Sequence, residues 1–114
     1  MADSAPVKPK VYIAGPMRGL PFLNYPAFHL AAMRLRDSGY IVLNPSELES
    51  FFGPNGQIHD LIRRDVHVIV NELKPPIDGI VLLPGWEKSV GARAEKHLAE
   101  WCGLWVMTLK EALS

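Results

Sequence analysis

Two carboxylates stand out because the helix faces that carry them are otherwise apolar. In segment 89–103, the i, i+3, i+4 rule places Glu95 on one face with small and apolar side chains, namely Gly91, Ala92, Leu98, Ala99 and Cys102. In segment 57–73, Asp65 shares a predicted inward face with Ile58, Leu61, Ile62 and Ile69. We expect the neighbouring Arg63, Arg64 and His67 to point elsewhere. Desolvating a carboxylate on such a face is costly unless the group is paired or used.

Two inward carboxylates beside a cleft suit general acid–base chemistry, or a nucleophile working with an acid. Cleavage of a glycosidic bond uses such a pair. The alternative is that each acid lies at the edge of its stripe and reaches solvent or caps a loop. The presence of two such acids on consecutive helices favours the catalytic interpretation of Glu95 and Asp65.

Alternating apolar and amphipathic segments predict the elements that position these acids. We expect strands at 10–15, 40–45, 78–86 and 104–109, and helices at 24–39, 57–73 and 89–103, with a loop at 46–56. This order, with right-handed crossovers, predicts an α/β fold: a flavodoxin/Rossmann-like three-layer sandwich with a four- to five-stranded parallel sheet. Residues 1–9 are expected to be a flexible leader, and residues 10–114 a single domain.

Ligands of such sheets bind outside the carboxyl ends of the strands, where the loops "GPMRGLP", "NPSE" and "PGWEKS" are expected. Arg18 lies on the first loop, as a candidate anion ligand or as a solvated turn residue. Ser89 either caps the third helix or holds a phosphate together with the first-turn amides. Trp86 is either a core aromatic or a platform for a planar base. The candidate binding residues are therefore Gly15, Met17, Arg18, Gly19, Asn44, Trp86, Ser89 and Gly91.

The composition of the chain limits the kinds of partner that we expect the protein to bind. Twelve basic residues balance twelve acidic ones over 114 residues, so no global field favours a nucleic acid polymer or a membrane surface. No apolar run approaches a membrane span, and no secretory signal is evident. Cys102 is the single cysteine, which fits a reducing, cytoplasmic location. The four histidines lack metal-ligand spacing, so we expect neither a metal nor a cofactor.

The motifs "YIAGPMRG", "RD" late in the second helix and "SVGARAE" resemble those of the nucleoside 2-deoxyribosyltransferase superfamily. The resemblance runs from about Lys10 to Val106. The chain looks most like short, phage-associated members, and it is also similar to the 2'-deoxynucleoside 5'-phosphate N-hydrolases. It departs from the transferases in having "PGWEKS" where they carry an Asp-rich segment. It departs from the hydrolases in having "LPFLNYP" after the first loop.

The resemblance implies roles for individual residues. Glu95 in "GARAE" matches the glutamate that attacks the anomeric carbon, and Asp65 matches the aspartate that assists the leaving base. Tyr12 matches a first-strand tyrosine that orients the nucleophile, although a buried core tyrosine is the simpler interpretation of that position. Arg18 and Ser89 match the phosphate-binding positions of the hydrolases. Family members also form homo-oligomers, which implies a dimer or a larger assembly.

Three functions remain open at this point. The first is cleavage of the N-glycosidic bond of a (deoxy)nucleoside 5'-monophosphate by a retaining, metal-free mechanism, as a hydrolase or a deoxyribosyltransferase. The second is a binding protein for a nucleotide or a nucleotide-derived signal, because fold alone does not fix function. The third is an interaction module with no small ligand.

Overall fold

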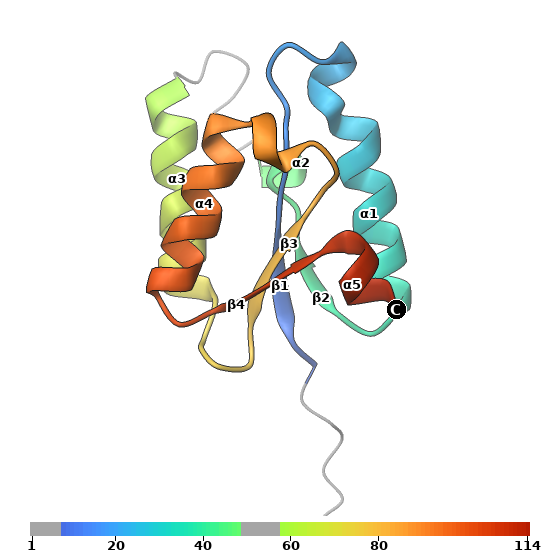
Figure 1. Ribbon diagram of the computed structural model, residues 1–114, viewed down its shortest axis with the longest axis vertical. Helices are drawn as coiled ribbons and strands as arrows, with labels where there is room; N and C mark the ends of the chain where they lie inside the picture. Colours follow the sequence, from blue (N-terminus) through green and yellow to red (C-terminus); the bar gives the residue numbers. More distant parts are fainter. Residues whose placement is uncertain (1–7, 49–57) are drawn as a thin grey trace, which may run out of the picture.

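The computed structural model describes residues 8–48 and 58–114, which form a three-layer α/β fold (Figure 1). Four parallel strands make one sheet in the order β2-β1-β3-β4. The strands are β1 (Lys10–Ala14), β2 (Ile41–Leu43), β3 (Gly79–Leu82) and β4 (Trp105–Thr108). This is the order of the first four strands of a flavodoxin-like sheet, with its topological switch point between β1 and β3. The predicted fold class is confirmed, with four strands.

The helices cover both faces of the sheet (Figure 1). On one side lie α1 (Tyr25–Asp37) and the short α5 (Leu109–Leu113), and on the other lie α3 (Ile58–Glu72) and α4 (Val90–Trp101). Three single turns complete the described elements: η1 (Pro21–Asn24), α2 (Pro45–Leu48) and η3 (Trp86–Lys88).

Strand β1 shows why the sheet needs a helical layer on each side. Its successive side chains point to opposite faces. Val11 and Ile13 pack in the cluster formed with α1 and α5, whereas Tyr12 and Ala14 pack in the cluster with α3 and α4. All four are at most 1 % exposed, so the strand is buried on both faces.

Helix α1 buries an apolar stripe of Phe28, Ala31, Ala32 and Leu35. Helix α3 does not follow its prediction. Of its described side chains only Ile69 is fully buried, and Ile58 and Ile62 are 38 % and 48 % exposed. The inward face of α3 is therefore rotated away from the one that the apolar periodicity predicted. In this orientation α3 contacts α4 in the same layer.

Two further differences concern the segments between the main elements. The predicted loop 46–56 begins within a helical turn, α2, and residues 49–57 lie outside the described part of the chain. Most of the expected leader, residues 1–7, also lies outside it. None of the described helices is long and apolar enough to cross a membrane.

Candidate active site

Tyr12 is the centre of the candidate site. It lies in β1, is 1 % exposed and faces the α3–α4 layer. Its hydroxyl donates a hydrogen bond of 2.8 Å to Oε2 of Glu95. Burial raises the pKa of Tyr12 well above its usual value, and the charges of Glu95 and Asp65 act in the same direction. Tyr12 therefore stays protonated and remains a donor.

Glu95 reaches Tyr12 because of where α4 begins and how it packs. Ser89 caps the helix, its Oγ accepting a 3.1 Å hydrogen bond from the backbone N–H of Ala92. Ala92 and Ala99 are buried against the sheet. Glu95, one turn after Ala92 and one turn before Ala99, is held close to the sheet by these two small side chains. It remains partly exposed.

The environment of Glu95 disfavours its charged form. Burial raises its pKa from 4.5 to about 8, the hydrogen bond from Tyr12 and the charge of Arg64 oppose this rise, and the charge of Asp65 adds to it. Such a shift in a carboxyl group placed next to a second acid is typical of functional sites. At neutral pH the free protein therefore holds Glu95 mainly in its protonated form.

Asp65 comes from α3 and is paired with the preceding residue in the sequence. Both Nε and Nη2 of Arg64 donate to Oδ1 of Asp65, at 2.9 and 2.7 Å, with only 11 % and 19 % of the two side chains exposed. Burial nevertheless raises the pKa of Asp65, against the opposing effects of Arg64 and of the Tyr12 hydroxyl. Tyr12 is thus coupled electrostatically to both carboxylates.

Arg64 is the functional candidate that sequence reasoning missed, and the expectation that it points away from the Asp65 face is wrong. Its Nη2 also donates to the carbonyl oxygen of Pro45 at 3.3 Å, and this contact draws the side chain inward. Its Nη1 is buried and has no hydrogen-bond partner within the described residues. The adjacent "RD" pair was the available signal, because a basic residue next to a buried acid can neutralise it.

The residues expected to bind phosphate are less tightly organised. Arg18 is exposed on the loop after β1, and Gly19 takes φ +80°, a left-handed conformation that glycine adopts without strain. The Ser89 hydroxyl is engaged as the α4 cap, which was one of its two predicted roles. The first-turn N–H groups of α4 lie at the same end of the helix.

The other candidate binding residues have structural partners. The Oδ1 of Asn44 accepts from the backbone N–H and Oγ of Ser46, at 3.0 and 2.8 Å. Trp86 packs on the α3–α4 core cluster and carries the ammonium of Lys96 5.6 Å from its ring centre. A Cβ at Gly15 would lie 2.8 Å from Cβ of Leu83, so a close approach requires glycine there. Met17 packs on the opposite core cluster, and Gly91 faces open space.

The structure therefore brings Tyr12, Asp65 and Glu95 together with Arg64, and it leaves Arg18 at the surface. Within residues 8–48 and 58–114, no three His, Cys, Asp or Glu side chains are grouped so that they could hold a metal ion. The arrangement offers two carboxyl groups of raised pKa, and the neutral hydroxyl of Tyr12 interacts with each of them. One carboxyl can act on carbon while the other moves a proton.

The sequence matches the family described as Domain of unknown function (DUF4406) over residues 9–108, and the chain belongs to this family. Comparison with curated proteins gives no match, and neither does comparison with solved structures.

Proposed function

We propose that this protein cleaves the N-glycosidic bond of a (deoxy)nucleoside 5'-monophosphate with retention of configuration, Glu95 being the nucleophile. We also propose that its family is related to the nucleoside 2-deoxyribosyltransferase superfamily. The observation that carries the proposal is the Glu95 carboxyl group, hydrogen-bonded to the buried Tyr12 and electrostatically coupled to Asp65.

The energetic cost of this carboxyl group supports a functional role. Raising the pKa of Glu95 from 4.5 to about 8 corresponds to a few kcal/mol against folding at neutral pH. Domains of this size have only about 5–15 kcal/mol of stability in total. Glutamine would fill the same space without that charge, so the cost is explained if catalysis needs the carboxylate.

The proposed reaction proceeds in two steps. An Oε of ionised Glu95 attacks the anomeric carbon as the bond from that carbon to the base nitrogen breaks. The base leaves with the bonding electron pair and takes a proton from Asp65. Water, deprotonated by Asp65, then attacks the same carbon and releases Glu95, giving sugar 5-phosphate. In the transferase variant of the reaction, a second base takes the place of water.

The surroundings of Glu95 favour the oxocarbenium-like transition state of such a cleavage. A carboxylate in a poorly solvated site interacts more strongly with developing positive charge than one in water does. The Tyr12 hydroxyl holds Oε2 in place, which leaves Oε1 for the sugar. Arg18 and the amino end of α4 would receive the 5'-phosphate.

A specific observation also favours the alternative of a nucleotide-binding protein that does not turn its ligand over. With a pKa of about 8, Glu95 is mainly a neutral acid at pH 7 and can donate a hydrogen bond to a bound ligand without attacking it. The two functions differ in one respect. The enzyme releases base, whereas the binding protein is stabilised by a nucleotide that remains intact.

The experiment is incubation with a panel of ribo- and deoxyribonucleoside monophosphates and the matching nucleosides, followed by chromatography for free base. Glu95→Ala tests the nucleophile, and Glu100→Ala is the matched control, because it removes an exposed glutamate from the same helix. Release of base by the wild type and the control, but not by Glu95→Ala, supports the proposal. Thermal stabilisation by a nucleotide that is recovered intact would favour the binding protein instead.

A further inference from the structure

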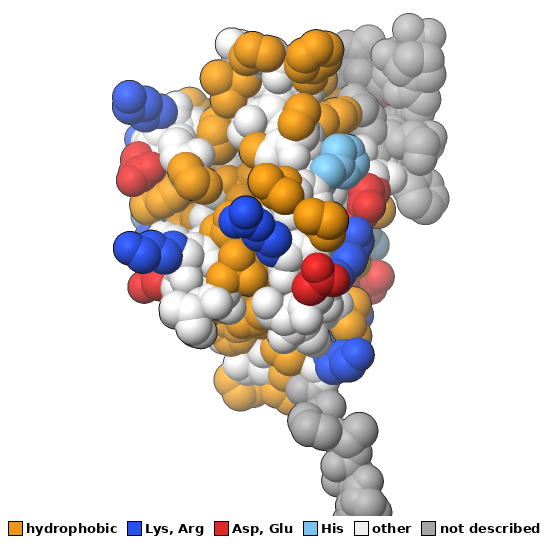
Figure 2. All heavy atoms as spheres, turned by 90° about the vertical axis from the view of Figure 1, so that its right-hand side faces the viewer, with side chains coloured by type: hydrophobic (Ala, Val, Ile, Leu, Met, Phe, Trp, Pro, Cys, Tyr) orange, Lys and Arg blue, Asp and Glu red, His pale blue; other side chains and the backbone are white. Residues whose placement is uncertain are grey.

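Arg64 on α3 is largely buried, with only 11 % of its side chain exposed. Arginine is almost never buried in a folded protein unless it is paired. The other arginines of the chain are all exposed: Arg18, Arg34, Arg36, Arg63 and Arg93. Figure 2 shows how Lys and Arg side chains stand at the surface on the side of α1 and α5. The burial of Arg64 is therefore not a general property of the basic residues of this chain.

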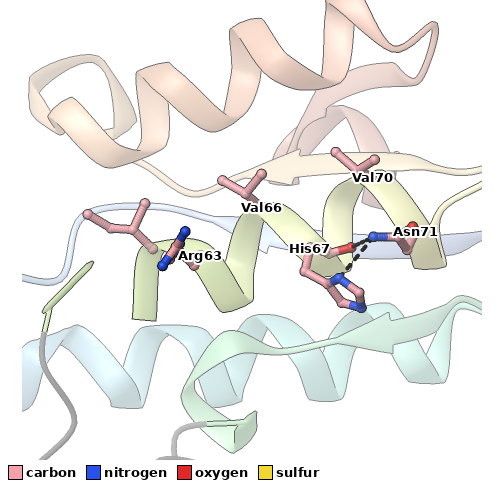
Figure 3. Close-up of a pocket in the computed structure, with 6 residues that line it drawn as sticks. Arg63, Val66, His67, Val70 and Asn71 are labelled. Carbon is pink, nitrogen blue, oxygen red and sulfur yellow. Dashed lines mark hydrogen bonds between the residues drawn. The ribbon is translucent and has the colours of Figure 1, made fainter. Parts of the chain in front are cut away.

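The ion pair of Arg64 with Asp65 is not one that an α-helix favours. Adjacent side chains point about 100° apart around the helix axis, whereas residues three or four apart face each other. The guanidinium nevertheless reaches the next residue with two donors, Nε and Nη2, which lie 2.9 and 2.7 Å from the same oxygen, Oδ1. The neighbouring Arg63 is exposed and lines a shallow groove with Val66 and Val70 (Figure 3). The two consecutive arginines thus take different courses from the same helix.

The carbonyl oxygen of Pro45 holds the guanidinium in this position. It accepts from Nη2 of Arg64 at 3.3 Å, so this one nitrogen bridges α2 and the carboxylate of Asp65. The carbonyl is itself well fixed, because Pro45 is buried at the start of α2. The preceding Asn44, 1 % exposed, accepts through Oδ1 from the backbone N–H and the hydroxyl of Ser46. A line of contacts therefore runs from the end of β2 through α2 to the acid on α3.

This position leaves Nη1 of Arg64 buried, with no acceptor in the described part of the chain. A buried donor without a partner is rare and destabilising, because its hydration is lost and not replaced. An apolar side chain of similar size would fill the same space without this cost. Among residues 8–48 and 58–114, the ionic partner of Arg64 is Asp65 alone, so the effect of the guanidinium on Asp65 accounts best for its burial.

We propose that Arg64 is a positioning residue: it occupies Oδ1 of Asp65, so that the carboxyl group carries and delivers its proton through Oδ2. The inference rests on the proposed function, in which Asp65 protonates the leaving base. A carboxylate oxygen offers about two acceptor sites, and the two donors of Arg64 fill those of Oδ1. No N–H group of the described residues donates to Oδ2, which is therefore the oxygen available to the proton.

The groups that face Asp65 show what else the guanidinium does for the site. The titratable neighbours from the other elements are the Tyr12 hydroxyl on β1 and the Glu95 carboxyl on α4. Burial raises the pKa of both acids, and Arg64 acts against this rise at each of them. Since one cation balances one negative charge, the site is neutral when one acid is ionised and the other is protonated. That is the state required by a nucleophile that works with an acid.

The first test measures the ionisation of Asp65 and does not depend on catalysis. Carboxyl ¹³C shifts of the full chain, labelled at aspartate, are followed by NMR through acidic and neutral pH, with Asp65→Asn assigning the signal. In Arg64→Met the pKa of Asp65 should move upward, because the hydrogen bonds and the charge that lower it are lost. Arg64→Lys keeps the charge without the fork, and should give an intermediate pKa. Arg63→Met is the matched control and should titrate as the wild type does.

An Asp65 titration that is the same in Arg64→Met as in the wild type would overturn the proposal, whether or not the protein releases base. If the wild type releases no base but Arg64→Met shifts the titration, the proposed function fails and the hold of Arg64 on Asp65 stands. The two failures are thus distinguishable.

The second test asks whether Arg64 acts through Asp65 when the base leaves, a step on which kcat/KM reports. Arg64→Lys should lower kcat/KM for a cleaved monophosphate at least about tenfold, because the acid is misplaced. With p-nitrophenol in place of the base, the leaving group needs no proton, and the loss should be much smaller. Adding Arg64→Lys to Asp65→Asn should cause little further loss. Equal losses with both leaving groups, or additive losses in the double variant, would show that Arg64 does not act through Asp65.

Discussion

Replacing Glu95 by glutamine should stabilise the folded protein at neutral and alkaline pH while it abolishes catalysis. The folded-state pKa of Glu95, about 8, lies above its unfolded value of 4.5, so the folded protein binds this proton more tightly. The stability contributed by that proton is fully present below pH 4.5 and is lost as the pH rises through 8. Asp65, whose pKa is also raised, contributes in the same direction in both proteins.

The magnitude follows from linkage. For a shift from 4.5 to about 8, the loss at pH 7 is about 3 kcal/mol, and it approaches roughly 5 kcal/mol above pH 8. Glu95 is partly exposed, and solvent screening reduces these values, so they are upper limits. Glutamine keeps an acceptor for the Tyr12 hydroxyl and does not ionise. A gain of about 1–3 kcal/mol at pH 7 corresponds to a rise in Tm of roughly 4–12 °C in a domain of this size.

The assay is urea denaturation of the wild type and Glu95→Gln at a series of pH values from 5 to 9, with Glu100→Gln as a control. Wild-type stability should fall with rising pH more steeply than that of Glu95→Gln, and the two curves should converge toward pH 5. The control changes an exposed glutamate whose ion-pair partners within the described part of the chain, Lys96 and His97, lie on the same helix, so its stability should change by less than about 1 kcal/mol. Parallel curves for wild type and Glu95→Gln, with no gain at pH 8, would refute the raised pKa.

The remaining predictions concern neighbouring groups. Tyr12→Phe removes a hydrogen bond that lowers the pKa of Glu95, so the rising limb of the pH profile of kcat/KM should move to higher pH. The rate should also fall by about tenfold or more. A rising limb that does not shift would contradict this prediction. Ser89→Ala removes the α4 cap, and the free energy of unfolding measured by chemical denaturation should fall by about 1 kcal/mol. If Ser89 also binds phosphate, the KM for monophosphates should rise while the KM for nucleosides stays the same. Gly79→Ala would bring a Cβ into collision with the carbonyl oxygen of Trp105 in the adjacent strand, and it should cost at least about 1–3 kcal/mol by the same assay. A neutral substitution would show that the sheet can adjust there.

Much of the fold could be predicted because the local signals agreed with one another. The expected helix 24–39 is α1 at Tyr25–Asp37, and the expected helix 89–103 is α4 at Val90–Trp101, with Ser89 as its cap. The expected third strand, 78–86, is shorter in the structure, at Gly79–Leu82. The chain then turns through Gly85, at φ +90°, into the turn η3.

The orientation of α3 could not be predicted in the same way. Apolar periodicity placed Ile62 inward and Arg64 outward, and the structure has Ile62 half-exposed and the Arg64 side chain only 11 % exposed. An isolated pattern cannot determine where the neighbouring helix lies or that a carbonyl oxygen of α2 is available to an arginine. The pairing of Arg64 with Asp65, and hence the electrostatics of the site, depended on that tertiary context.

The candidate site, like the fold, could be predicted from the sequence only in part. Glu95 and Asp65 were identifiable because they interrupt apolar faces, and the hydrogen bond from Tyr12 explains how Glu95 is tolerated there. The buried Asp78 has a structural role instead, because its two carboxylate oxygens accept from the backbone N–H groups of Lys10 and Lys74 at 2.8 Å each. The role of Trp86 was not decided by residue type, because a core aromatic and a platform for a planar base use the same side chain.

The most direct test of the central claim is intact-mass spectrometry of the protein mixed with a nucleoside monophosphate that it cleaves, carrying fluorine at the 2'-position. The electron-withdrawing fluorine slows hydrolysis of a glycosyl–enzyme ester, so the ester can accumulate. The account predicts a mass increase of one fluorinated sugar phosphate, located on Glu95 by peptide mapping and absent in Glu95→Gln. Base release that continues in Glu95→Gln, or an adduct on another residue, would contradict the assignment of Glu95 as the nucleophile.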